Sequence, residues 1–282
     1  MGGHPPLTSF LYASPMLDFW QLVVLAIIQG LTEFLPVSSS AHLILPSEVL
    51  GWPDQGVLID VMAHFGSLFA VLIYFREDVA RIILGLLDML RRTMSRDAAL
   101  ALALLIATPP ALVFGVLLEA GGITEMLRSW KVIAATSIGF GILLLLADIW
   151  GPRTRTTEDI GWKDAALMGL AQAVALIPGT SRSGITMTAG RGLGLTRVEA
   201  ARFSMLMGIP VIAAGGLYSL LKLATGEAGG ATLGTGLAVA VLSFIAAYAA
   251  IALFMRWVPR IGMGPFALYR ILLGALLIVM FL

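Results

Sequence analysis

The sequence predicts an all-α polytopic membrane protein with about six transmembrane helices and two re-entrant helical hairpins in an inverted-topology repeat. Three observations support this fold class. Of the 282 residues, 59% are hydrophobic and only 12% are charged, whereas a soluble domain carries roughly 25% charged residues. Six apolar stretches are long enough to cross a bilayer. Two shorter apolar runs each stop at a proline that small polar residues follow.

Composition excludes several classes of function. The formal net charge is +1 and no long basic run occurs, so nothing indicates nucleic acid as a partner. The absence of cysteine excludes disulfides, thiolate catalysis and Cys-ligated zinc. Three histidines leave little for a histidine-rich metal site. A metal site would therefore depend on oxygen ligands.

The chain is predicted to be a single integral membrane domain over 1–282. Residues 1–15 have no basic segment and no continuous apolar core, so they are interpreted as a flexible leader or a remnant of cloning, not as a signal peptide. A first repeat is placed at 16–150 and an inverted second repeat at 160–282.

The predicted spans follow from runs of about 20 apolar residues. They cover about 57–75, 98–118, 132–149, 203–221, 233–255 and 266–282. The two interrupted runs cover about 17–35 and 165–177 and end at Pro36 and Pro178. Because a helix broken at membrane depth is typical of transporters with re-entrant segments, both runs are predicted to form re-entrant hairpins.

An internal duplication is predicted from the two proline breaks. Aligning Pro36 with Pro178 places Ser39 on Ser181 and Ser40 on Arg182. Each copy then holds one interrupted run and three spans, and because three is odd, the second copy is inverted. The alternative is that the short Pro-x-Ser-Ser pattern recurs by chance.

The distribution of Lys and Arg predicts the orientation. Thirteen of the eighteen basic residues fall in four segments on one side of the predicted topology: Arg76, Arg81, Arg91, Arg92, Arg96, Arg153, Arg155, Lys163, Arg191, Arg197, Arg202, Arg256 and Arg260. The positive-inside rule assigns this side to the cytoplasm and both termini to the outside. Arg182 and Arg270 remain near membrane depth, where they need internal partners.

The first polar segment combines a carboxylate with hydroxyls and an imidazole. Gln29 and Glu33 are four residues apart and share one helix face. The run 38–40 of three serines follows Pro36, and His42 comes next. Glu33 or His42 could deprotonate a serine or a water molecule. Alternatively, Gln29 and Glu33 only form hydrogen bonds with neighbouring helices.

The second polar segment is suited to an oxyanion. Arg182 follows the Pro-Gly break beside several hydroxyls, which belong to Thr180, Ser181, Ser183 and Thr186. Amides at a helix start, hydroxyl donors and a guanidinium fork match phosphate or diphosphate. Alternatively, Arg182 neutralises a structural carboxylate. Arg270 is interpreted as a structural or supporting cation, and His64 as a hydrogen-bonded packing residue.

The two segments are expected to face each other near the midplane. A substrate there would need a charged head and a long apolar tail, because the pocket opens among lipid-facing helices. A lipid phosphate ester or anhydride meets both requirements.

At these residues the sequence resembles the undecaprenyl-diphosphate phosphatase family, also called the bacitracin-resistance proteins, over essentially everything after Met16. The family's motif of glutamate or glutamine, three residues and glutamate falls on Gln29 and Glu33. Its Pro-Val-Ser-Ser and histidine elements fall on 36–39 and His42. Its Pro-Gly-x-Ser-Arg-Ser motif falls on 178–183, with the following threonine at Thr186.

The resemblance implies removal of the terminal phosphate from undecaprenyl diphosphate and from shorter isoprenoid diphosphates. It also implies a bacterial inner-membrane enzyme in the lipid bilayer, a site open to the periplasm and a divalent cation, Mg²⁺ or Ca²⁺. Gln29 removes one metal-binding carboxylate, so Glu33 carries more of any base or metal role. The oligomeric state, including a homodimer, is left open.

Two mechanisms are compatible with these motifs. In both, Arg182, backbone amides and a metal at Gln29 and Glu33 bind the diphosphate. Ser39 then attacks with Glu33 or His42 as base, or one of these activates water and Ser39 only binds phosphate. The remaining phosphate ligands are expected to be Ser38, Ser40, Thr180, Ser181, Ser183 and Thr186.

Two other classes of function compete with hydrolysis by these motifs. A transporter or flippase for polyprenyl phosphates would share the inverted-repeat fold. A membrane phosphatase resembling acid phosphatases would need a histidine nucleophile and a supporting histidine. The second alternative is disfavoured because the last histidine is His64 and none follows the second motif.

Overall fold

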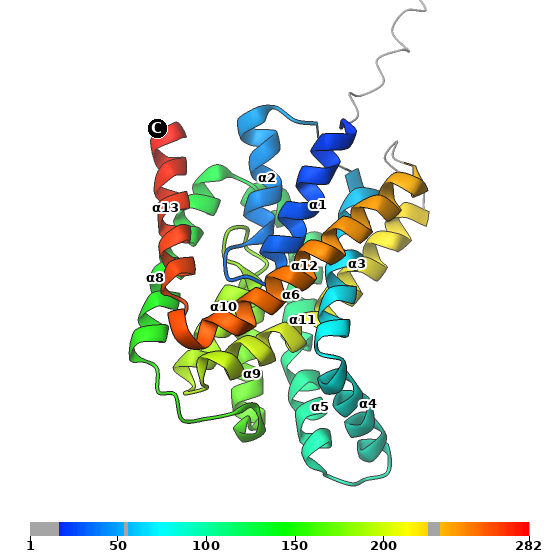
Figure 1. Cartoon of the computed structure of the whole chain (residues 1–282), viewed down its shortest axis with the longest axis vertical. Helices are drawn as coiled ribbons and strands as arrows, with labels where there is room; N and C mark the ends of the chain where they lie inside the picture. The colour runs from blue at the N-terminus through cyan, green and yellow to red at the C-terminus, as the bar shows by residue number, and fades with distance from the viewer. Residues whose placement is uncertain (1–16, 54–55, 225–231, 282) are drawn as a thin grey trace, which may run out of the picture.

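The computed structural model describes residues 17–53, 56–224 and 232–281, and this part of the chain is almost entirely helical (Figure 1). One isolated β-bridge, between Arg155 and Leu195, is the exception to helices and turns. The expectation for residues 1–15 lies outside the described residues.

Six helices of the described part are long and apolar enough to cross a membrane, which confirms the predicted number of spans. They are α3 (Gly56–Tyr74), α5 (Arg96–Ala107) continued by α6 (Pro109–Ala120), α8 (Trp130–Trp150), α11 (Arg197–Ala224), α12 (Leu233–Ile261) and α13 (Gly264–Phe281). The other helices are α1 (Phe19–Glu33), α2 (Ser39–Leu50), α4 (Arg76–Leu90), α7 (Ile123–Leu127), η2 (Thr157–Asp159), α9 (Trp162–Val174) and α10 (Arg182–Gly192).

The second span is divided at Thr108, where one continuous stretch was predicted over 98–118. Pro109 and Pro110 follow directly and have no backbone N–H to continue the ladder of α5. The hydroxyl of Thr108 donates to the carbonyl of Leu104 at 2.7 Å. As a result, α6 starts as a separate helix that packs beside α9.

Two helix–turn–helix units carry the polar motifs, namely α1 with α2 and α9 with α10. Their first helices have 15 and 13 residues, fewer than the roughly 20 that a crossing needs. These lengths suit the predicted re-entrant hairpins, but their placement in a membrane stays a prediction.

The two turns have matching backbones, which correct the predicted register. Ser38 and Ser181 both cap the second helix of their unit, with φ of 76° and 66°. The two equivalent hydroxyl pairs, Ser38 with Ser40 and Ser181 with Ser183, are each 3.2 Å apart. Ser38, not Ser39, therefore corresponds to Ser181. The proline alignment was wrong by one residue because the second turn has one more residue between its proline and its cap.

Close helix packing fixes the first unit against the bundle. α1 packs on α12, and a Cβ at Gly30 would lie 2.5 Å from the Ser243 carbonyl. The second unit packs through α9 on α5 and α6. Around both turns lies a buried apolar core that includes Phe34, Phe203 and Met187. The backbone of α1 at Gly30 therefore packs directly against the backbone of α12, and this close contact holds α1 and the polar residues at its end in place.

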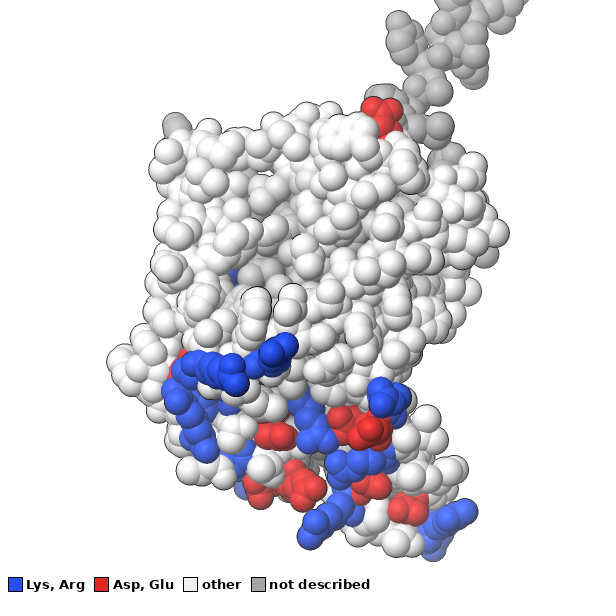
Figure 2. All heavy atoms as spheres, in the orientation of Figure 1, with Lys and Arg blue, Asp and Glu red and all other residues white. Residues whose placement is uncertain are grey.

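Most of the charged residues of the visible face gather at one end, over α4, α5 and the segment before α9, while nearly all of the remaining face carries no Lys, Arg, Asp or Glu (Figure 2). Buried Asp148 organises this end: it accepts two 2.7 Å hydrogen bonds from Arg197 and one of 3.1 Å from the Met263 N–H. Arg155 donates to Asp164 at 2.6 Å and holds the pKa of that carboxyl below its usual value. The Asp148 contacts join α8 to α11 and to the residue that precedes α13, and the Arg155 contact ties the segment before α9 to that helix.

Candidate active site

Glu33 is the centre of the site. It is the last residue of α1 and is 8% exposed. Its Oε2 accepts hydrogen bonds from the Ser39 hydroxyl at 2.8 Å and the Gln29 amide at 2.9 Å. Its Oε1 accepts from Arg182 Nη2 at 2.9 Å. A carboxylate that receives a serine hydroxyl and a guanidinium can act as a base next to a bound anion.

The first turn aims the Ser39 hydroxyl at Glu33. Ser38 caps α2 in a left-handed backbone conformation that is uncommon for a residue with a side chain. The chain therefore reverses sharply after Val37, and Ser39 becomes the first residue of α2. Backbone strain of this kind clusters at functional sites, where the surrounding packing maintains it.

Arg182 opens α10 and lies between the two turns. Besides Glu33, it contacts the Ser204 carbonyl at 3.4 Å and lies over the Phe34 ring at 5.4 Å. Gly208 on α11 makes room for it, because a Cβ there would overlap Nη1 and lie 2.6 Å from Cζ. The guanidinium is thus fixed from three sides, as a specific anion contact requires.

The two turns contact each other directly. The Ser183 hydroxyl donates to the Leu35 carbonyl at 2.7 Å, while within the second unit the Ser181 hydroxyl accepts from the Gly184 N–H at 3.1 Å. The ion pair between Glu33 and Arg182 joins the same two segments. The predicted meeting of the two motifs is therefore present in the structure.

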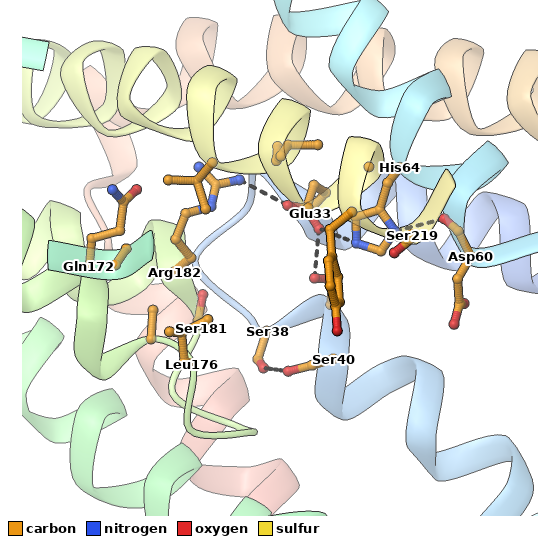
Figure 3. Close-up of a pocket in the computed structure, with 18 of the residues that line it drawn as sticks. Glu33, Ser38, Ser40, Asp60, His64, Gln172, Leu176, Ser181, Arg182 and Ser219 are labelled. Carbon is orange, nitrogen blue, oxygen red and sulfur yellow. Dashed lines mark hydrogen bonds and ion pairs between the residues drawn. The ribbon is translucent and has the colours of Figure 1, made fainter. Parts of the chain in front are cut away.

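A cavity of about 430 Å³ opens beside these residues. Figure 3 shows Arg182 and His64 on opposite sides of Glu33, with Ser38 and Ser40 across the cavity. One part of the wall is polar, and another part is apolar or small, contributed by Ala111, Ala175, Leu176, Val211, Ile212, Gly215 and Gly216. Such a cavity suits a molecule with a charged head and an apolar tail.

The cavity is lined by six of the predicted site residues, namely Glu33, Ser38, Ser39, Ser40, Ser181 and Arg182. The other five, Gln29, His42, Thr180, Ser183 and Thr186, are not among its lining residues. Gln29 supports Glu33 from α1, and Ser183 supports the turn of the first unit. Both therefore act on the cavity through a neighbour.

His42 lies away from the cavity, which differs from its predicted position as an alternative base for Ser39. Its Nδ1 is 2.7 Å from the Ser38 carbonyl and its Nε2 is 2.5 Å from the Tyr269 hydroxyl. The ring stacks on Tyr269 beside an apolar groove between α1 and α13. Its contacts with the Ser38 carbonyl and the Tyr269 hydroxyl hold the imidazole toward α13 and not toward Glu33.

The two predicted threonine ligands are buried behind Arg182. Thr186 lies one turn further along α10, where its hydroxyl is 2.6 Å from the Ser204 hydroxyl. The Thr180 hydroxyl is buried without a hydrogen-bond partner among the described residues, while its carbonyl accepts from Arg270. Neither side chain is placed to contact a phosphate in the cavity.

Several lining residues were not predicted as site residues. His64, interpreted as a packing residue, places Nε2 3.9 Å from Glu33 Oε2, with Nδ1 2.8 Å from the Asp60 carbonyl. Asp60 and Gln172 also line the cavity. The sequence did contain a signal for Gln172: it precedes Ser181 by nine residues, as Gln29 precedes Ser38. No comparable pattern marked His64 and Asp60.

The fold and the site define an integral membrane protein with a pocket between two helix–turn–helix units. One part of the pocket wall is polar and suits an oxyanion, and another part is apolar. The comparison with known families agrees with this class. Residues 22–276 match the family model described as Bacitracin resistance protein BacA. The chain therefore belongs to the bacitracin resistance protein BacA family.

Curated relatives are similar over nearly their whole length. The undecaprenyl-diphosphatase of Maricaulis maris is 56% identical over 262 residues, which cover 92% of this chain and 98% of the relative. That of Teredinibacter turnerae is 51% identical over 93% of this chain and 99% of the relative. That of Hahella chejuensis is 52% identical over 92% of this chain and 97% of the relative.

Proposed function

We propose that the protein hydrolyses undecaprenyl diphosphate to undecaprenyl phosphate and inorganic phosphate, which recycles the lipid carrier for peptidoglycan and other envelope polymers. The observation that carries the proposal is the hydrogen bond from Ser39 to Glu33, whose other oxygen pairs with Arg182. The activity named for the relatives favours hydrolysis over the transport alternative. Shorter isoprenoid diphosphates are proposed as further substrates.

The cavity geometry supports a serine nucleophile. Ser39 Oγ would attack the terminal phosphorus while its proton passes to Glu33, 2.8 Å away. The bond from that phosphorus to the bridging oxygen breaks, and undecaprenyl phosphate leaves. Glu33 passes the proton on to the departing undecaprenyl phosphate and becomes a base again. Water then attacks the phosphoserine while Glu33 accepts its proton, and Glu33 returns that proton to Ser39 Oγ as phosphate leaves. In the competing route, Glu33 activates water directly and Ser39 only binds phosphate.

Arg182 is proposed to bind the diphosphate. Its guanidinium already lies beside the Glu33 carboxylate and can form two parallel hydrogen bonds to phosphate oxygens. Ser38, Ser40 and Ser181 line the same wall and supply hydroxyl donors. Together these groups offset the charge that develops on the transferring phosphoryl group.

A divalent ion, Mg²⁺ or Ca²⁺, is proposed to bind with the substrate. Glu33 is one carboxylate ligand, and Gln29 Oε1 beside it is buried without a hydrogen-bond partner among the described residues. The described residues contain no group of three His, Cys, Asp or Glu side chains that could hold a metal. This donor set suits Mg²⁺, which takes one or two protein ligands plus phosphate oxygens and water. The ion would neutralise phosphate charge.

We further propose that the protein lies in the bacterial inner membrane with the cavity open to the periplasm. The positive-inside rule assigns the basic end in Figure 2 to the cytoplasm. The cavity residues Asp60 and Ser219 lie near the start of α3 and toward the end of α11, away from that end. Matching turns at Ser38 and Ser181 support two inverted repeats at 16–150 and 160–282. A homodimer remains one oligomeric state to be tested.

The proposed function is tested by phosphate release from undecaprenyl diphosphate with purified protein, detergent and Mg²⁺. Ser39→Ala and Arg182→Ala are expected to lose turnover by at least about 10²-fold, while both variants remain folded with a cooperative thermal unfolding transition. Matched controls are Ser47→Ala, on the same helix but outside the cavity, and Arg96→Ala, which is exposed. Turnover retained in Ser39→Ala would discard the serine route, and no release by folded wild type would discard the function.

A further inference from the structure

Arg270 on α13 is fully buried and lies directly behind the second turn. Its Nη2 donates to the carbonyls of Gly179 at 3.1 Å and Thr180 at 2.6 Å. It also reaches the Thr136 carbonyl of α8 at 3.5 Å. One nitrogen of the guanidinium therefore holds the backbone of the turn that precedes Arg182.

The other two nitrogens of Arg270 are buried without a hydrogen-bond partner among the described residues. Within the same residues, no ion pair joins this guanidinium to a carboxylate. A buried charge without a counter-ion costs several kcal/mol. Such a group at membrane depth indicates a function that requires the charge.

The unpaired charge lies next to the start of α10. A Cβ on Gly184 would be 2.6 Å from Arg270 Nη1, and the Ser181 side chain borders the same position. Arg182 lies on the cavity side of this helix end, where Glu33 already compensates its charge. The surplus positive charge at the second turn therefore comes from Arg270.

We propose that Arg270 is a positioning residue that raises the affinity of the second turn for the diphosphate from behind, without contacting it. The guanidinium holds the Gly179 and Thr180 carbonyls away from the cavity, and its charge adds to the positive end of α10. The anion in the cavity then supplies the negative charge that Arg270 lacks. This inference rests on the proposed function, because it assumes that a diphosphate occupies the cavity.

Three variants of Arg270 separate charge from hydrogen bonding. Arg270→Lys keeps the charge, Arg270→Gln keeps a donor for the carbonyls, and Arg270→Met keeps neither. The probe is methylenediphosphonate, a diphosphate analogue that resists hydrolysis, and its Kd is measured from the thermal stabilisation of purified protein in detergent. Arg256→Gln is the matched control, because it removes the same charge from an exposed position on α12.

We expect the Kd to rise about ten-fold in Arg270→Gln and Arg270→Met, and to change less in Arg270→Lys and Arg256→Gln. The KM for farnesyl diphosphate should rise in parallel. A wild-type Kd in folded Arg270→Gln would overturn the proposal, and so would the failure of all three variants to fold, since Arg270 would then be purely structural. Wild type that binds the analogue but releases no phosphate would overturn the proposed function instead.

Discussion

At the scale of single residues, the site depends on the position of one guanidinium. Arg182 reaches Glu33 across the boundary between the two hairpins, and Gly208 is the residue on α11 that leaves room for it. The position of Arg182 is therefore decided by the lack of a side chain at 208. Gly208, which is not among the residues that line the cavity, therefore controls where Arg182 lies in it.

Gly208→Ala is predicted to lower kcat by about 10²-fold, because a displacement of about 1 Å at a reacting group costs that much. The added methyl would overlap the end of the Arg182 side chain, which can move, so the melting temperature should stay near that of the wild type. Phosphate release and thermal unfolding measure the two effects. Gly139→Ala is the control, since a Cβ there meets nothing within 4 Å. Unchanged kcat in Gly208→Ala would contradict the role of this space.

His42→Asn is predicted to keep most of the activity, whereas His42→Ala loses more. The imidazole contacts the Ser38 carbonyl, and an asparagine amide can donate to the same oxygen. Alanine removes a hydrogen bond worth about 1 kcal/mol from the strained turn. Initial rates of phosphate release compare the two variants. Complete inactivity of a folded His42→Asn would show that the imidazole itself takes part in the reaction.

Glu33, Ser39 and Arg182 could be predicted because polar residues stand out within apolar runs. The position of His42 could not, since the sequence places it near the serines, and only the direction of α2 turns it toward Tyr269. His64 was missed for the opposite reason: it lies thirty-one residues after Glu33 and reaches it only through the packing of α3.

At the scale of helices, the close approach of α3 and α12 fixes one wall of the cavity. A Cβ at Gly66 would overlap the Ala240 carbonyl and lie 2.9 Å from the Phe244 N–H. His64 and Asp60 are carried on the same helix. The side chains that complete the cavity therefore depend on a backbone contact two residues away from His64.

Gly66→Ala is predicted to destabilise the protein by about 1–3 kcal/mol, the usual cost of overpacking. Backbone atoms cannot move aside as a flexible side chain can, so α3 must shift as a whole. Thermal unfolding in detergent measures the change against Gly139→Ala, which has open space at its Cβ. Equal melting temperatures of the two variants would show that α3 and α12 can separate without cost.

Hydropathy identified the long helices well but described their breaks poorly. The run 98–118 is apolar throughout, and only the absence of N–H groups at Pro109 and Pro110 ends α5 at Ala107. The register of the two hairpins was off by one residue because proline was used as the marker. The structurally matching positions are the caps, Ser38 and Ser181.

At the scale of the whole molecule, Asp148 joins helices that are distant in sequence. It pairs with Arg197 and with the fully buried Arg191.

Asp148→Asn is predicted to destabilise the fold by about 3–5 kcal/mol, because two buried or half-buried cations would lose their counter-charge. The free energy of unfolding is compared with Glu77→Gln, an exposed carboxylate. If the free energy of unfolding falls no more in Asp148→Asn than in Glu77→Gln, the Asp148 ion pairs do not stabilise the fold.

Gly215→Leu is predicted to weaken the binding of substrates that carry an isoprenoid tail, without changing the binding of the diphosphate head group. Gly215 lines the apolar wall of the cavity, and a Cβ there meets nothing within 4 Å. The KM for farnesyl diphosphate should rise about ten-fold, while the Kd for methylenediphosphonate, which has no tail, should not change. Gly139→Leu is the matched control. A parallel rise in both constants would place the tail elsewhere.

The number of spans could be predicted because each must be apolar along its whole length. Which helices contact each other could not, since lipid-facing and buried positions are equally apolar in such a chain. Close approaches at Gly30 and Gly66 depend on three-dimensional fit, which no periodicity in the sequence marks.

The ion pair between Glu33 and Arg182 also has a consequence for biosynthesis. Its partners are 149 residues apart, and at about 5–20 residues per second a ribosome needs on the order of ten seconds to add that length. If the first hairpin is re-entrant as predicted, it enters the bilayer during this interval with a carboxylate that has not yet met its cation. The nascent first half must therefore keep Glu33 hydrated or protonated, and insertion is complete only when the second hairpin arrives.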